Sequence, residues 1–246
     1  MARDKAYRLI HACFCSLDAA ASALRGEPSL ISERTGTGET PLHYLVVENN
    51  LEAVRFLHEA GAELNVQDDF GASPLADSLR LGYLEVTEYL LGHGADPHSV
   101  DENGRTALHA AVDGGVPRLV QSVLAAGGGP AVFDSVGDSP LHLAIQKKAL
   151  DVVRVLLTAG VDVNLRQQLS EETPLHVAAR TGNVTLIQLL LRAGADPRLT
   201  DDEGRTPAME AERFGLVAAE TCLREAEQAD QTMTPPDRPS GPTRDG

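Results

Sequence analysis

The sequence is poor in aromatic residues and in cysteine. Five phenylalanines, four tyrosines and no tryptophan occur among 246 residues, which disfavours folds built on large aromatic anchors, such as the immunoglobulin sandwich. The three cysteines, Cys13, Cys15 and Cys222, are too few for a disulfide framework or a four-cysteine zinc site. We therefore expect reduced thiols and a cytoplasmic location.

Long apolar runs and excess positive charge are also missing. No segment approaches the roughly 20 apolar residues of a membrane-spanning helix, and the first residues lack the apolar core of a secretory signal. Lysine and arginine total 21 against 36 acidic residues, a net charge of −15, which argues against binding to nucleic acid or to an anionic membrane. The acidity is regional, because residues 40–105 carry 3 basic and 12 acidic residues. A partner with a basic surface would be attracted to that part of the chain.

An internal repeat covers nearly the whole chain. One short pattern recurs as TPLHYLV, SPLADSL, TALHAAV, SPLHLAI, TPLHVAA and TPAMEAE, beginning at Thr40, Ser73, Thr106, Ser139, Thr173 and Thr206. The steps are 33, 33, 33, 34 and 33 residues. A fixed period of this length is typical of proteins built from stacked supersecondary units.

Each unit carries the signals of two helices. The threonine or serine is a good N-cap, and the proline that usually follows suits the first helical position. A second helix follows, with apolar residues at Leu51, Val54 and Leu57 in one copy and at Val184, Ile187 and Leu190 in another. Glycine then stands where a left-handed helix cap is expected, at positions 61, 94, 127, 160 and 194.

This pattern resembles the ankyrin repeat family, through the T-P-L-H-x-A string and loops such as GADPHSVDENGRT (94–106). The resemblance implies an all-α solenoid of helix-turn-helix units with short β-hairpin loops, about seven repeats with the caps included. We predict a repeat domain over residues 1–228. It has an N-terminal cap (5–37), repeats starting near 38, 71, 104, 137 and 171, and a C-terminal cap (204–228), where Glu212 replaces an apolar residue. A disordered Pro-rich tail is expected over 229–246.

The resemblance also implies a function, which is protein–protein interaction through hairpin tips and first helices that line a concave face. A monomeric adaptor or regulatory inhibitor is expected. Carried over position by position, the candidate partner-binding residues are Asp69, Phe70, Arg80, Leu81, Glu102, Asn103, Arg105, Ser135, Val136, Asp138, Gln146, Lys147, Arg180, Asp202 and Glu203. Phe70, Leu81 and Val136 are candidate anchors, because apolar side chains are unusual at such tips. The loop 164–173 has an extra residue and lacks the usual Asp and Gly, and is either sequence drift or a specialised contact.

No catalytic residue, metal ligand or cofactor is predicted. The motif histidines are His43, His109, His142 and His176. Successive repeats are roughly 10 Å apart and these histidines lie one or two repeats apart, so neighbours cannot share a zinc ion with bonds of about 2 Å. The resemblance gives them a structural role, as ties between hairpins. Acidic loops such as Asp201–Gly204 lack the EF-hand spacing. Two alternatives remain, a hydrolase with an Asp–His pair on the concave face, for which His98 is the candidate, and a passive scaffold for several partners.

Overall fold

The computed structural model describes residues 2–231, and side-chain burial for residues 5–229. The described chain is helical, beginning with α1 (Ala2–Cys15), α2 (Leu17–Gly26) and the 3-10 helix η1 (Pro28–Ser32). The remaining helices are α3 (Pro41–Val47), α4 (Leu51–Glu59), α5 (Pro74–Arg80), α6 (Leu84–Gly92), α7 (Ala107–Gly114), α8 (Pro117–Ala125), α9 (Pro140–Gln146), α10 (Leu150–Thr158), α11 (Pro174–Thr181), α12 (Val184–Arg192), α13 (Pro207–Arg213) and α14 (Val217–Gln231). None of the described helices is both long and apolar enough to cross a membrane.

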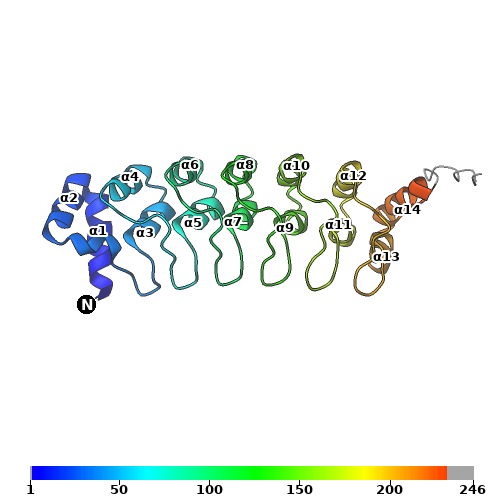
Figure 1. Cartoon of the computed structure of the whole chain (residues 1–246), viewed down its shortest axis with the longest axis horizontal. Helices are drawn as coiled ribbons and strands as arrows, with labels where there is room; N and C mark the ends of the chain where they lie inside the picture. The colour runs from blue at the N-terminus through cyan, green and yellow to red at the C-terminus, as the bar shows by residue number, and fades with distance from the viewer. Residues whose placement is uncertain (1, 232–246) are drawn as a thin grey trace, which may run out of the picture.

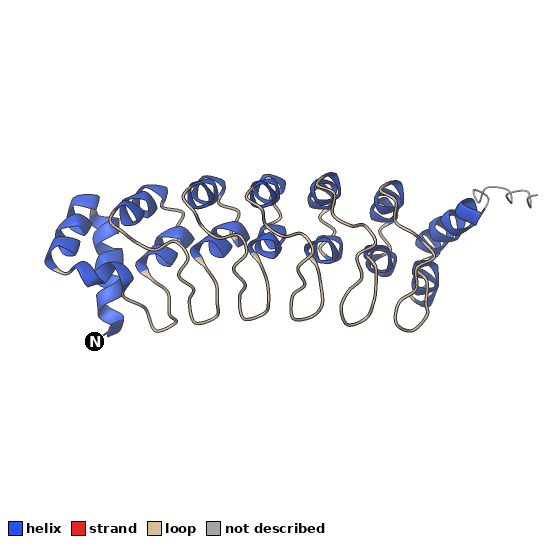
Figure 2. Ribbon diagram, in the orientation of Figure 1, coloured by secondary structure: helices blue, strands red, loops and turns tan. Residues whose placement is uncertain are grey.

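Successive helix pairs stand side by side in a single row, which confirms the predicted solenoid (Figure 1). From α3 to α12, the second helices of the pairs form one layer and the first helices another, and the connecting loops project beyond the first helices (Figure 2). The loops have a hairpin shape but form no strand within residues 2–231, where one isolated bridge joins Val100 to Thr106. The predicted β-hairpins are therefore tight turns without a regular β-ladder.

The predicted helix boundaries are confirmed at the first helix of each repeat. Thr40, Ser73, Thr106, Ser139, Thr173 and Thr206 are the N-cap residues in extended conformation. The glycines at 61, 94, 127, 160 and 194 all have positive φ, between 80° and 100°. Helix α14 continues to Gln231, three residues beyond the predicted end of the repeat domain, and the rest of the predicted tail, 232–246, lies outside the described residues.

One continuous apolar core runs along the stack. Leu42, Leu45 and Val46 of α3 and Val54 and Leu57 of α4 are completely buried, and the same positions of later pairs extend this cluster as far as Leu223. Because a single helix pair has too little surface to bury its own core, the neighbouring pairs supply most of the contacts. At the C-terminal end, the exposed Glu212 occupies the position that Val46 and Val112 fill in earlier pairs, which supports the predicted cap.

The motif histidines tie each helix pair to the next hairpin. The Nε2 atoms of His43, His109, His142 and His176 bond to the carbonyl oxygens of residues 72, 138, 172 and 205 at 2.9–3.2 Å. In His43, Nδ1 accepts the Thr40 backbone N–H at 3.1 Å, and the same bond forms in His109 and His176. An imidazole that accepts at Nδ1 and donates at Nε2 is neutral, so this geometry opposes protonation.

Burial adds to that preference. It lowers the pKa of all four motif histidines, and the pKa of His142 falls to about 4. Two repeats lack the tie, because Ala76 and the exposed Met209 occupy the histidine position. The junction between the α5–α6 pair and the α7–α8 pair therefore depends on packing and on hairpin contacts alone.

We expect His142→Ala to lower the melting temperature at pH 7.5, because it removes hydrogen bonds worth about 1–3 kcal/mol. The folded-state pKa of His142 lies below its ordinary value of 6.5, so its contribution is present above pH 6.5 and is lost as the pH falls toward 4. Thermal melts between pH 8 and 4 should show the gap between wild type and variant closing in acid. A constant gap, or a rise in melting temperature on adding zinc, would contradict the structural role.

We expect Leu156→Ala to cost about 2–5 kcal/mol of unfolding free energy, and Leu223→Ala to cost clearly less. Both side chains are completely buried, but Leu156 of α10 lies inside the stack and Leu223 lies in α14, the last described helix. In a one-dimensional stack the end unit can open alone. Chemical denaturation of both variants measures the difference, and equal losses would show that residues 204–228 do not act as a cap.

Candidate functional site

The hairpin tips form a regular row along one side of the molecule. In the hairpin of Asp68, its backbone N–H donates to Ala72 O, and its carboxylate accepts the N–H groups of Phe70 and Ala72 at 2.8–2.9 Å. Asp101, Asp134 and Asp201 repeat this arrangement. Backbone hydrogen bonds also join successive tips, as from Glu102 N–H to Phe70 O at 3.0 Å. The tips are therefore held in place both within and between repeats.

Apolar side chains are exposed on this row. Phe70 is 54% exposed, Val136 62% and Leu169 71%. Phe70 and Val136 were predicted as anchors, but Leu169 was missed. Leu81, at the C-terminal end of the first helix α5, is exposed as predicted, and Val47 and Phe214 are exposed at the corresponding ends of α3 and α13. We call the tips together with the exposed ends of the first helices the inner face.

The irregular loop 164–173 keeps the hairpin shape in spite of its extra residue. Gln167 N–H donates to Glu172 O across five residues instead of four, and Glu171 takes positive φ. Gln168 bonds to Gly137 O, one residue further along the preceding tip than the regular pattern. Leu169 lies over Gly137, where an added Cβ would be 3.3 Å from Leu169 Cγ. The loop thus places Leu169 beside Val136, at two neighbouring tips.

The other predicted partner-binding residues fall into two groups. Those exposed as expected are Asp69, Arg80, Glu102, Asn103, Ser135, Gln146, Lys147, Asp202 and Glu203. Arg105 and Arg180 are only half-exposed, and Asp138 is buried. The predicted surface role of Asp138 disagrees with this position, because its carboxylate accepts bonds from Gln146 and Gln167 inside the protein.

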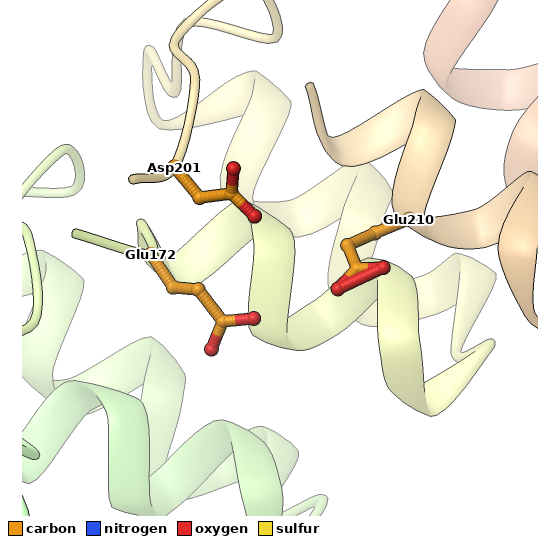
Figure 3. A group of neighbouring side chains, drawn as sticks. All are labelled: Glu172, Asp201 and Glu210. Carbon is orange, nitrogen blue, oxygen red and sulfur yellow. The ribbon is translucent and has the colours of Figure 1, made fainter. Parts of the chain in front are cut away.

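Buried carboxylates lie behind the inner face. Asp77, Asp138, Glu172, Asp201 and Glu210 are all buried. Three of them, Glu172, Asp201 and Glu210, come together between the last two helix pairs, with one oxygen of each within 4.8 Å of the others (Figure 3). Among residues 5–229, whose side chains the structure describes, this is the one group of three acidic, histidine or cysteine side chains close enough to hold a metal ion.

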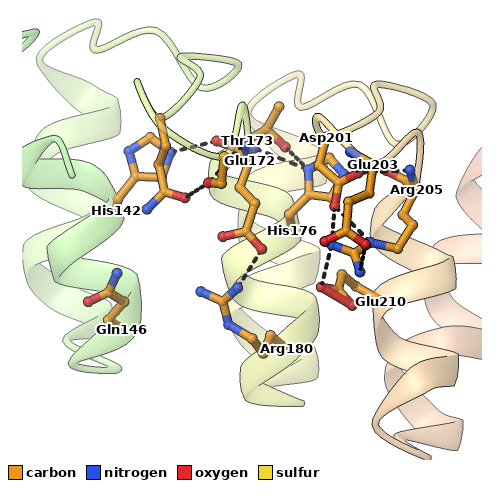
Figure 4. A network of polar contacts seen from close by, with 12 residues as sticks. His142, Gln146, Glu172, Thr173, His176, Arg180, Asp201, Glu203, Arg205 and Glu210 are labelled. Carbon is orange, nitrogen blue, oxygen red and sulfur yellow. Dashed lines mark hydrogen bonds and ion pairs between the residues drawn. The ribbon is translucent and has the colours of Figure 1, made fainter. Parts of the chain in front are cut away.

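One side-chain contact recurs along the stack and engages several of the polar residues on the inner face. In it, the side chain of the residue just before the N-cap bonds to the side chain eight positions later, on the first helix. Arg105 donates to Asp113 at 2.6 Å and Gln146 to Asp138 at 2.7 Å. Arg180 donates to Glu172 in the same way, and Figure 4 shows this pair. Arg205 instead contacts Asp201, Glu203 and Glu210. The complementary residue types eight apart were the sequence signal for this network.

Asp77 is a buried carboxylate on α5 whose burial is only partly compensated. Desolvation raises its pKa to about 6, although Arg80 lies 2.5 Å away and acts in the opposite direction. The neighbouring acids Asp68 and Glu39 add to the increase. Charged Asp77 therefore costs stability at neutral pH.

His98, the candidate for an Asp–His catalytic pair, lies on the loop after α6 and is exposed. Its backbone N–H donates to Asp96, and no carboxylate of residues 5–229, the described side chains, bonds to its ring. The ring lies near Gly127, close to the end of the second helix α8. The hydrolase alternative therefore gains no geometric support here.

The comparisons with known proteins agree with this architecture. The family model described as "Ankyrin repeats (3 copies)" matches residues 9–101, 79–167 and 159–232. Among solved structures, the ankyrin repeat domain of Bcl-3, described as a unique member of the IkappaB protein family, is similar with 27% identity and a TM-score of 0.71. That match covers 77% of this chain and 86% of the Bcl-3 chain. No curated protein matches significantly.

We expect Asp77→Asn to stabilise the protein above pH 6. The folded-state pKa of about 6 exceeds the ordinary value of 3.8, so folding favours the protonated form, and stability falls as the pH rises from about 4 to about 6. The gain at pH 7.5 should be at most about 3 kcal/mol and should vanish below pH 4. Denaturation at both pH values, with the exposed Asp69→Asn as control, measures it. A less stable variant at pH 7.5 would mean that the Arg80 ion pair outweighs desolvation.

Proposed function

Because the chain belongs to the ankyrin repeat family, we propose that it binds a protein partner along its inner face and acts as an adaptor or a regulatory inhibitor. The observation that carries this proposal is the exposure of Phe70, Val136 and Leu169 on hairpin tips that backbone bonds hold rigidly. Binding energy concentrates in a few apolar or aromatic anchors. Anchors on a preorganised surface lose little conformational entropy on binding.

The partner is basic where it meets the N-terminal half of the inner face. Glu48, Asp69 and Glu102 are exposed there. The nearby cations are engaged, Arg80 with Asp77 and Arg105 with Asp113 and Asp134. A basic side chain of the partner close to Asp77 would favour the charged carboxylate, which gives a reason to retain a residue that costs stability.

The remaining parts of the proposal concern the setting. The net charge of −15 supports a protein partner over nucleic acid or an anionic membrane. The free cysteines support a cytoplasmic location. The polar end at Glu212 supports a monomer whose stack ends at α14. The role as a binding module, without catalysis, is favoured over the hydrolase because His98 lacks a bonded carboxylate in the described part of the chain.

Affinity capture with matched variants tests the proposal. Immobilised wild type, a Phe70→Ala/Leu169→Ala variant and a Phe14→Ala control are exposed to the same extract, and bound proteins are identified by mass spectrometry. Phe14 is about as exposed as Phe70 but lies on α1, outside the row of tips. A partner retained by wild type and control and lost by the tip variant supports the proposal. Retention of every bound protein by the tip variant would count against the inner face.

With a partner in hand, we expect Asp69→Lys combined with Glu102→Lys to slow association several-fold at low salt. Both residues are exposed, so they act mainly by long-range attraction, which fades as salt rises. Glu59→Lys with Glu88→Lys is the matched control, since it makes the same change of net charge on the exposed surface of the second helices α4 and α6. Stopped-flow or surface-plasmon kinetics at two salt concentrations separate the variants. Equal slowing by both pairs would show that only net charge matters.

Phe70→Ala should act on the other rate constant. An anchor that becomes buried in the complex contributes more than about 1 kcal/mol, so its loss should accelerate dissociation at least about fivefold and change association little. Phe14→Ala should leave both rates unchanged. If the dissociation rates of wild type and Phe70→Ala agree, Phe70 is not an anchor, and the same measurement on Leu169→Ala tests the neighbouring tip.

A further inference from the structure

The C-terminal end of the stack contains a group of carboxylates that the interaction surface does not use. We propose that Glu172, Asp201 and Glu210 form a binding site for a divalent cation of the size of Ca²⁺. The three residues come from different elements, namely the loop before α11, the loop before α13, and α13 itself. A cation held by all three would join the last two helix pairs.

The geometry brings three acidic oxygens to one place. One oxygen of each residue lies within 4.8 Å of the others, and Figure 3 shows the three carboxylates converging from their separate elements. All three side chains are buried. Like charges held this close out of water repel strongly unless cations neutralise them.

Glu210 supplies the independent indication of a missing ligand. Its side chain is only 2% exposed, and its Oε2 is buried without a hydrogen-bond partner. Its Oε1 makes two long ion-pair contacts, at 3.7 Å to Arg205 and 3.6 Å to Arg213. Both distances exceed hydrogen-bonding range. A buried carboxylate oxygen with no hydrogen-bond partner is costly, and the Glu210 carboxylate as a whole points toward the other two acids (Figure 3).

The kind of ligand favours Ca²⁺ over Mg²⁺. Ca²⁺ accepts several carboxylates in a flexible geometry, at Ca–O distances of about 2.3–2.6 Å. Mg²⁺ demands a near-ideal octahedron at about 2.1 Å and keeps most of its waters, so proteins usually hold it through only one or two carboxylates. Three carboxylates with oxygens within 4.8 Å of one another therefore suit Ca²⁺ better. Ca²⁺ takes 6–8 oxygens, and water completes the shell.

The neighbouring arginines compete with the cation for the same carboxylates. Arg180 pairs with Glu172, and Arg205 donates to Asp201 through Nε and Nη2, both at 2.9 Å. Arg205 is also 2.7 Å from the exposed carboxylate of Glu203. When a cation enters, Arg205 turns away from the cluster and keeps Glu203 as its partner. Removing the guanidinium therefore favours the cation.

Calorimetric titration of the full chain with CaCl₂ in 150 mM NaCl tests the site, because that salt screens diffuse binding to an acidic surface. Wild type should bind one Ca²⁺ saturably, with a dissociation constant of about 10⁻⁵ to 10⁻³ M. Glu210→Gln and Glu172→Gln should each weaken binding at least tenfold. Arg205→Gln should tighten it several-fold. Asp202→Asn, which removes an exposed acid of the same loop that does not pair with Arg205, should leave it unchanged.

Amide hydrogen exchange gives a second measurement that does not depend on the heat released on binding. Ca²⁺ should slow amide exchange over residues 170–215 in wild type and not in Glu210→Gln, while α3 to α6 remain unaffected. Three outcomes would overturn the proposal. They are no saturable binding up to about 10 mM Ca²⁺, unchanged affinity in Glu210→Gln, or a more stable Glu210→Gln in a protein that ignores Ca²⁺. The last outcome would mean that arginines and a shared proton already satisfy the three acids.

Discussion

Contact between neighbouring units is the constraint on which the whole structure depends. A 33-residue helix pair cannot enclose a core, so its stability comes from the pair on either side. The apolar cluster provides most of that energy, and two polar devices fix its geometry. These are the histidine that reaches the next hairpin and the backbone bond between successive tips. The inner face is rigid because both devices act directly behind it.

The elements that sequence predicted well are those encoded locally. The N-cap residue recurs six times and the positive-φ glycine five times, and each is a signal carried by a single residue. The starts of the first helices and the ends of the second helices could therefore be predicted directly from the sequence. Residues whose role depends on a neighbouring unit were harder. Leu169 was hidden by the extra residue in its loop, and the gathering of Glu172, Asp201 and Glu210 spans separations of 29 and 38 residues. Asp138 resembled a surface acid because its partners, Gln146 and Gln167, lie in other elements.

Some charged residues of the inner face are paired with one another, and others remain exposed to solvent. The pairs such as Arg180 with Glu172 join each loop to its own first helix, and they leave little uncompensated charge in the C-terminal half. In the N-terminal half, Asp69 and Glu102 stay exposed beside Phe70. At that end, the acidic residues that would attract a basic partner therefore lie next to Phe70, the proposed apolar anchor. Further along, Val136 and Leu169 offer a mostly apolar contact. A partner that spans both regions would need a graded surface, basic at one end and apolar at the other.

The histidine ties also have a direction, since each points from one unit to the hairpin of the next, and the last unit, with Met209, has none to reach. Such a chain has a distinct head and tail but interchangeable middle parts. Duplication or loss of one interior repeat leaves every remaining histidine with a carbonyl acceptor in the hairpin that follows it. The length of the inner face can therefore evolve in whole-repeat steps, through recombination within a gene, while both ends keep their specialised chemistry.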